Sequence, residues 1–216
     1  MPRRILAGTI CSLLVLMLAP TMLVAQSHLR TAHTKGSPVI TPAEPHSSAL
    51  KTIFSNLGPS ATNEYNDTFG YYVLGPTNTI GFSEQWIAVP FTPKANSTVT
   101  ELQAAIGWEA GTKKMNLGLY SDNAGVLGTL LASAEAHAFP NFGTCCHLVT
   151  VTITATAVTA GTQYWIGATS DDTNAPNFQA VWESSNSSNI GGDVALAGWF
   201  TFSGGVPAAA ALGTIP

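Results

Sequence analysis

The segment His147-Leu-Val-Thr-Val-Thr-Ile-Thr-Ala155 decides the fold class of this 216-residue chain. Its apolar side chains at Val149, Val151 and Ile153 alternate with threonines. Because side chains of a β-strand point alternately to opposite faces of a sheet, this pattern predicts a strand with one buried and one solvated face. Such half-covered strands are typical of antiparallel sheets.

The same alternation occurs in other segments, and turn residues such as Leu57-Gly58-Pro59 and Ser121–Gly125 separate the runs. The segment Ser97–Trp108 is predicted to be one strand with Leu102, Ala104, Ile106 and Trp108 on its core face, and Lys114–Ser121 places Met115, Leu117 and Leu119 together. No convincing amphipathic helix is found. We therefore predict an all-β fold, an antiparallel β-sandwich of jelly-roll type with about ten strands.

Three regions are expected along the chain. Residues 1–25 resemble a secretory signal peptide, since Arg3 and Arg4 precede an apolar stretch that ends near the small residue Ala25. A membrane anchor is the competing interpretation. Residues 26–50 contain three prolines and no apolar periodicity, which predicts a disordered Pro/Ser/Thr linker. Residues 51–216 are expected to form the sandwich domain.

The charge and composition of the chain restrict its partners. Without the predicted signal peptide, six basic residues face twelve acidic ones, and no arginine follows Arg30. Nucleic-acid binding requires a basic surface, so nucleic-acid partners are excluded. Few residues are charged, and Thr, Ser, Asn and Gly are abundant, which is typical of secreted all-β proteins. We expect a secreted or cell-envelope protein with no membrane span after signal cleavage.

A succession of motifs resembles the choice-of-anchor R type domain of secreted bacterial proteins. The motifs are EQWIAVPFTP (84–93), STVTELQAAIGW (97–108), MNLGLYSDNAGVLGTLLA (115–132) and VTAGTQYWIGA (158–168). The resemblance covers roughly Lys51 to Thr214 and implies an extracellular β-sandwich that different proteins attach to the envelope by different tails. It implies no catalytic residues.

This chain departs from that family in its last residues. The ending SGGVPAAAALGTIP (203–216) lacks an apolar helix followed by basic residues. Free secretion is therefore expected in place of anchoring.

Catalysis is not expected. The chain contains neither a G-x-S-x-G nor an H-E-x-x-H motif. A glycosidase needs two carboxylates across a sugar, and no spacing selects such a pair among the scattered acids. A polysaccharide hydrolase with an unrecognised carboxylate pair remains an alternative.

Tryptophans are the candidate ligand-binding residues: Trp165, Trp182 and Trp199. Strand alternation in TQYWIGAT (162–169) sets Trp165 on the face opposite Tyr164 and Ile166, where a solvent-facing ring would stack on a sugar. Packing of Trp165 under a loop is the structural alternative. The partner expected from this interpretation is a glycan or an envelope polymer.

The loop Thr169–Asn177 offers a second candidate site. Asp171 and Asp172 supply carboxylates, and the neighbouring asparagines supply amide oxygens, which calcium prefers as ligands. The structural alternative is an Asp/Asn turn that bonds its own backbone. Structural calcium at Asp171 and Asp172 is thus a hypothesis, and no other cofactor is expected.

Cys145 and Cys146 are the only cysteines after residue 25. An oxidising compartment favours a vicinal disulfide between them, although neighbouring Cα atoms in a strand sit closer than an ordinary disulfide requires. Buried free thiols, intermolecular pairing and metal binding are the alternatives. Extension of the alternation back from Val149 predicts Cys145 and His147 on the core side and Cys146 on the threonine side.

The sequence is therefore compatible with three functions. The leading hypothesis is a secreted, non-catalytic β-sandwich module that binds carbohydrate or a surface polymer. The second is a structural or adhesive surface protein without a small ligand, and the third is the hydrolase named above. An exposed aromatic platform would favour the first hypothesis, and a long unpaired edge or a large apolar patch would favour the second.

Overall fold

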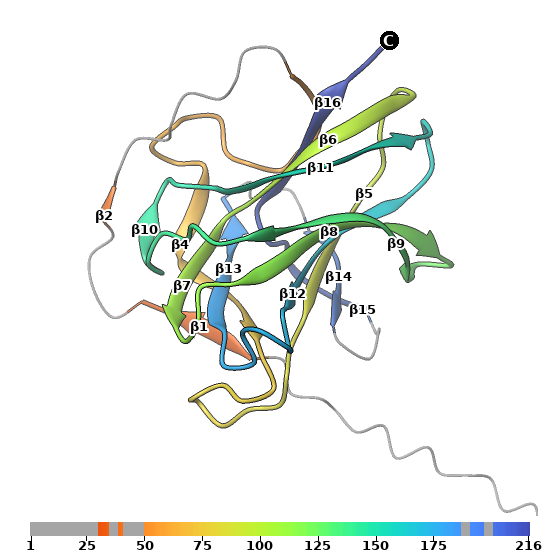
Figure 1. Cartoon of the computed structure of the whole chain (residues 1–216). Helices are drawn as coiled ribbons and strands as arrows, with labels where there is room; N and C mark the ends of the chain where they lie inside the picture. The colour runs from red at the N-terminus through yellow and green to blue at the C-terminus, as the bar shows by residue number, and fades with distance from the viewer. Residues whose placement is uncertain (1–29, 35–38, 41–49, 187–190, 197–200) are drawn as a thin grey trace, which may run out of the picture.

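The computed structural model describes residues 30–34, 39–40, 50–186, 191–196 and 201–216 of the chain (Figure 1). These residues form strands and no helix, so the all-β class and the antiparallel sandwich are confirmed. The jelly-roll connectivity stays a prediction. The proposed signal peptide, residues 1–25, lies outside the described residues. Within the described ranges, no helix is long and apolar enough to cross a membrane.

One layer of the sandwich is a six-stranded antiparallel sheet. Its strands, in order across the sheet, are β15 (Thr201–Gly205), β14 (Gly191–Leu196), β5 (Ile87–Phe91), β12 (Tyr164–Ser170), β8 (Met115–Asn123) and β9 (Val126–Ala136). β8 and β9 form a hairpin, and the turn that joins them contains Ala124 and Gly125, both of which have a positive φ.

Two four-stranded sheets and one short pair make up the rest of the described strands. The first sheet has the order β1 (Thr31–His33), β4 (Tyr65–Leu74), β13 (Gln179–Ser185) and β7 (Ile106–Ala110). The second has the order β11 (Val149–Val158), β6 (Ser97–Ala104), β16 (Ala209–Thr214) and β3 (Lys51–Ser55). The pair consists of β10 (Thr144–Cys145) and β2 (Val39–Ile40), which run parallel.

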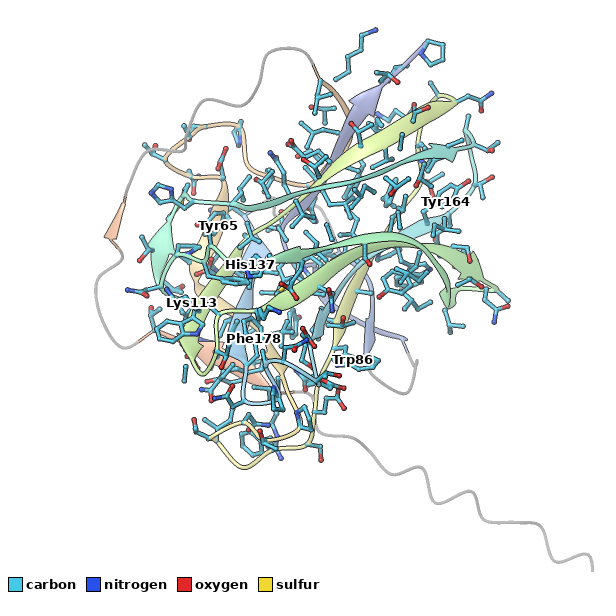
Figure 2. All side chains as sticks on the ribbon, in the orientation of Figure 1. Tyr65, Trp86, Lys113, His137, Tyr164 and Phe178 are labelled. Carbon is cyan, nitrogen blue, oxygen red and sulfur yellow. A yellow bond between two sulfur atoms is a disulfide. The ribbon has the colours of Figure 1, made fainter. Side chains whose placement is uncertain are left out.

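A single large apolar core joins the two layers. Leu117 and Ile166 of the six-stranded sheet belong to the same buried cluster as Val151 of β11 and Trp182 of β13. The predicted alternation of β11 is confirmed, because Val149, Val151 and Ile153 are buried while the threonines between them are exposed. Tyr65 and Tyr164 lie toward opposite ends of this sandwich (Figure 2).

The segment Ser97–Trp108 is not the single strand that its alternation predicts. It divides at Ala105 into β6, which pairs with β11 and β16, and β7, which pairs with β13. The N–H of Ala105 donates to Ala208 O at 3.0 Å, and Ala105 O accepts from Glu183 N at 2.7 Å. Ala105 is therefore the point where the chain leaves one sheet for the other, and its side chain is buried in a small separate cluster while Ala104 and Ile106 belong to the main core.

The expected linker between residues 26 and 50 contains two short strands, so the prediction of no regular structure is wrong for Thr31–His33 and Val39–Ile40. β1 extends the edge of β4, and Ala32 is buried there. The side chain of Gln85 holds the preceding residue, since it accepts from Arg30 N at 3.1 Å and donates to Arg30 O at 3.2 Å. A strand of three residues is too short to show an alternating pattern in the sequence. β1 forms because it pairs with the open edge of β4, which the sequence pattern does not reveal.

Candidate functional site

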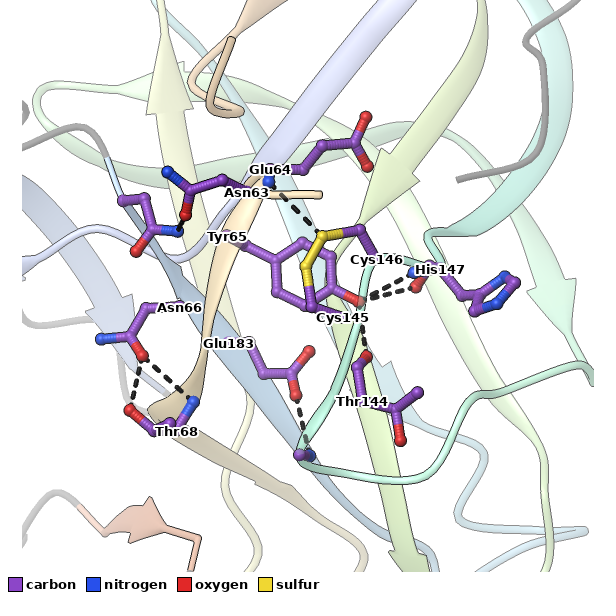
Figure 3. The surroundings of a disulfide bond; sticks show 12 residues. Asn63, Glu64, Tyr65, Asn66, Thr68, Thr144, Cys145, Cys146, His147 and Glu183 are labelled. Atoms are coloured by element: carbon purple, nitrogen blue, oxygen red, sulfur yellow. Dashed lines mark hydrogen bonds between the residues drawn. A yellow bond between two sulfur atoms is a disulfide. The ribbon is translucent and has the colours of Figure 1, made fainter. Parts of the chain in front are cut away.

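Cys145 and Cys146 are joined by a disulfide at the end of β10, across a cis peptide bond (Figure 3). Both side chains are buried, and they pack in a small cluster with Tyr65, Ala105 and Ala208. The disulfide is thus part of the protein interior, close to the point where the chain changes sheets.

The predicted orientation of the cysteines is wrong in one respect. Cys146 is fully buried and does not share the solvent-facing side of the threonines of β11. The regular alternation begins only at Val149, because residues 146–148 form a turn between β10 and β11. His147 is half-buried beside this turn. A strand period cannot be extended through a turn, since the backbone rotates there.

The hydroxyl group of Tyr65 forms hydrogen bonds with the backbone on both sides of the two cysteines. Its hydroxyl lies 2.9 Å from Thr144 O and 3.2 Å from His147 O, and it accepts from His147 N at 2.9 Å (Figure 3). The backbone N–H of Glu64 also donates to the sulfur of Cys146 at 3.5 Å. One side chain of β4 therefore holds both ends of the turn that carries the cysteines.

A bulge in β4 brings two carboxyl groups to this place. Glu183 pairs with Gly70, but the next residue, Ser184, pairs with Asn66. Residues 67–69 are therefore extra residues on β4, and Asp67 lies within this bulge, close enough to Glu183 to raise its pKa. Bulges redirect side chains in this way and often occur beside functional sites. Glu183 is fully buried, Asp67 is 7% exposed, and the Gly143 N–H donates to Glu183 Oε1 at 3.2 Å.

Burial dominates the electrostatics of both carboxyl groups. It raises the pKa of Glu183 to about 9; the Gly143 N–H opposes this rise and the nearby Asp67 adds to it. Burial also raises the pKa of Asp67, against hydrogen bonding from its own N–H and that of Cys145. The pKa of Tyr65 rises as well, first through burial and then through Glu183. Glu183, Asp67 and Tyr65, which lie near the disulfide, are thus three poorly solvated acids with raised pKa values.

A surface pocket of about 250 Å³ opens beside the disulfide. Its lining consists of Thr62, Asn63, Tyr65, Asn66, Asp67, Cys145 and Asn186. We call this the disulfide pocket. The Asn186 side-chain amide donates to Asn63 Oδ1 across it, and Asn66 Oδ1 accepts from Thr68 N and Thr68 Oγ1. Amide groups, one carboxylate and the edge of the disulfide therefore face a common space.

The disulfide is expected to resist alkylation in the folded protein. In a variant with Cys11 replaced by Ser, iodoacetamide should add no adduct to the untreated protein, because both thiols are oxidised. Two adducts should appear in the intact mass after treatment with reductant and urea. Reductant without urea should give much slower labelling, since Cys146 has no exposed surface and Cys145 only 4%. Complete labelling without reductant would show that the bond is absent.

The expected solvent-facing tryptophan is not observed, and this corrects the prediction for Trp165. Its side chain is fully buried against Ala88, Leu127 and Tyr120, and its indole N–H donates to Asp122 Oδ1 at 2.8 Å. The outer face of β12 is covered, so alternation in this strand does not separate core from solvent. A ring without an exposed face cannot stack on a sugar.

The other two proposed tryptophans offer no platform within the described residues either. Trp182 is fully buried in the main core, where its indole N–H donates to Ala208 O at 2.8 Å. Trp199 lies outside the described residues.

The structure directs Asp171 and Asp172 to different partners. Asp171 accepts from Thr173 N at 3.2 Å and from Asn174 N at 3.1 Å, and the amide of Asn174 lowers its pKa. Asp172 accepts from the hydroxyl of Ser170 instead. This is the arrangement of an Asp/Asn turn. Among the described residues, no three His, Cys, Asp or Glu side chains gather to hold a metal.

The residues that line the disulfide pocket include several that the strand patterns do not select. The strand patterns do not select Asn63, Asn66, Asp67 or Asn186, and Glu183 is only one of the scattered acids among which no spacing selects a pair. The sequence does carry one signal, the polar run Thr62–Thr68, where two asparagines and two acids occur within seven residues. The second half of this run, Tyr65–Thr68, lies inside β4, where its polar residues are unusual because strand positions favour apolar and β-branched residues.

Comparisons with known proteins give no assignment of this site. No protein-family model matches the chain, and no curated protein matches it. The resemblance to the choice-of-anchor R type domain stays a prediction, and the function has to be inferred from the geometry of the site.

Proposed function

We propose that this protein is an extracellular, non-catalytic β-sandwich module that binds carbohydrate at the disulfide pocket. The observation that carries the proposal is the pocket lining, in which the side chains of Asn63, Asn66 and Asn186 surround one space with Asp67 and Thr62. A side-chain amide offers both donors and an acceptor, which suits the hydroxyl groups of a sugar.

The size and walls of the pocket narrow the ligand. At about 250 Å³ it lies just below the range of sites for drug-sized molecules, so a single sugar ring or the end of a glycan chain is the ligand that fits. Cys145 and Tyr65, both almost completely buried, complete the lining. Binding of this kind combines apolar contact with a few directed hydrogen bonds.

We propose binding without catalysis because too few carboxylates line the pocket. Asp67 is the only acid among the residues that line it, and Glu183 is buried behind the wall. Hydrolysis of a glycosidic bond by the usual route needs two carboxyl groups on either side of the sugar. The lining of the disulfide pocket offers one, so retention of the ligand is the expected outcome.

Binding is tested on a glycan array, followed by titration of the best ligand into the purified protein. Asn63→Ala and Asn186→Ala should each weaken binding about five- to tenfold, the usual effect of one lost hydrogen bond. Asn123→Ala is the matched control, because Asn123 is an exposed amide at the end of β8. No retention on any glycan, or equal binding by all variants, would refute the proposal. Release of reducing sugar from a bound polysaccharide would favour the hydrolase.

A further inference from the structure

We propose that Asp67 and Glu183 bind a calcium-sized divalent cation between β4 and β13. This site is separate from the loop at Asp171 and Asp172, and it does not depend on carbohydrate binding. Four observations on the described residues support it.

The first observation is that each carboxyl group has an oxygen with no partner in the protein. Glu183 Oε2 and Asp67 Oδ2 are both inaccessible to solvent and accept no hydrogen bond from the chain. Glu183 is fully buried and Asp67 is 93% buried by the same measure of exposure. A buried polar atom that is left unsatisfied costs about 1–3 kcal/mol, and more when it carries charge. Two such atoms in one place indicate that a ligand completes the site.

The second observation is the backbone that holds these groups. Asp67 lies in the bulge at residues 67–69 of β4, between Asn66, which pairs with Ser184 of β13, and Gly70, which pairs with Glu183. The Gly143 N–H donates to Glu183 Oε1, and hydrogen bonding from the Cys145 N–H acts on Asp67, so both acids contact the same short segment before the disulfide. The remaining oxygens, Glu183 Oε2 and Asp67 Oδ2, belong to residues of two paired strands and have no hydrogen-bond partner in the protein.

The third observation is the lack of a neutralising cation in the described part of the chain. The ion pairs found there join Lys114 to Glu135 and Asp171, and His137 to Glu135. None of them reaches Asp67 or Glu183. Glu64 adds a further acid close enough to act on Tyr65. A bound cation would supply the counter-charge that these two carboxyl groups lack among the described residues.

The fourth observation concerns the class of ion that the site would bind and the side from which the ion would enter. The cysteine sulfurs are tied up in the disulfide, so the available ligands are oxygens, which suit calcium and not thiophilic metals. Calcium takes 6–8 oxygen ligands, and two carboxylates supply up to four of them. Asp67 lines the disulfide pocket, so this pocket is the side from which an ion would enter and from which water ligands would be added to its shell.

The test is calorimetric titration of Ca²⁺ into EDTA-treated full-length protein, without sugar, together with thermal unfolding. We expect one ion per chain with a Kd at or below about 10⁻³ M, as in extracellular calcium modules, and a higher Tm with calcium. Glu183→Gln and Asp67→Asn should each weaken binding at least tenfold. If Glu183→Gln does not fold, the calcium affinity of Asp67→Asn tests the proposal by itself. Asp67 lies in the bulge and not in a regular part of the strand, so its substitution should disturb the fold less.

The matched control is Asp172→Asn, which removes a carboxylate from the loop at Asp171 without touching β4 or β13. It should bind calcium as the unmodified protein does. Three results would overturn the proposal: no heat and no Tm shift with calcium, full binding by both Glu183→Gln and Asp67→Asn, or loss of binding in Asp172→Asn alone. Since no glycan is present, failure here leaves the carbohydrate proposal standing, and the reverse also holds.

Discussion

Trp182→Ala is expected to lower the free energy of unfolding by about 3–5 kcal/mol, the range for removal of a large aromatic side chain from a core. Trp182 has no exposed surface and packs in the cluster that joins both layers of the sandwich. Its indole N–H also donates to Ala208 O at 2.8 Å, so the substitution leaves a cavity and removes one of the two hydrogen bonds that this carbonyl accepts. Urea unfolding followed by tryptophan fluorescence and circular dichroism measures the change.

Two further variants separate the causes of this loss. Trp182→Phe keeps most of the apolar volume but removes the bond to Ala208 O, so a smaller loss is expected. Leu130→Ala is the control, because Leu130 is 48% exposed and its truncation should change stability by less than about 0.5 kcal/mol. A loss below about 1.5 kcal/mol for Trp182→Ala would contradict the core role. Normal stability with lost glycan binding would instead restore Trp182 as a ligand-binding residue.

Gly107→Ala is expected to destabilise the protein by about 1–3 kcal/mol, because β7 and the segment before the disulfide approach too closely for a side chain. A Cβ at this position would lie 2.5 Å from Phe142 Cα and 3.1 Å from Glu183 Oε1. Trp108 holds the same segment by donating to Pro140 O at 2.8 Å and accepting from Phe142 N at 3.0 Å. The methyl group must therefore displace residues 140–143 from β7.

The displacement should also be visible at the site. Hydrogen exchange of the Gly143 N–H should accelerate in Gly107→Ala, because this N–H donates to Glu183 Oε1. Gly205→Ala is the matched control, since the nearest atoms to its Cβ would be 3.9 Å away and its φ is not positive. Equal stability of the two variants, with unchanged exchange at Gly143, would show that the segment tolerates the shift.

The strand patterns predict much of the core and little of the site. Val149, Val151 and Ile153, and likewise Met115, Leu117 and Leu119, are buried as alternation requires, because each lies on a strand with one face toward the core. Trp165 fails the same rule. β12 is central in its sheet and is covered on both faces, so its period of two carries no information about solvent.

The site could not be assembled from sequence because its residues meet only through long-range pairing. Asp67 and Glu183 are more than a hundred positions apart in the sequence. The bulge that contains Asp67 arises from the register in which β4 pairs with β13. The same holds for Tyr65, whose hydroxyl holds Thr144 and His147 across the fold.

By itself, the sequence determined the all-β class, the core faces of the regular strands and the adjacency of Cys145 and Cys146, because these depend on local periodicity and chemical order. Only the tertiary structure decided that both cysteines face inward as a disulfide, that Trp165 and Trp182 are buried, and that Asp67 and Glu183 share one place. Burial and the meeting of distant side chains depend on which strands pair and in what register, and a one-residue change of register reverses every face.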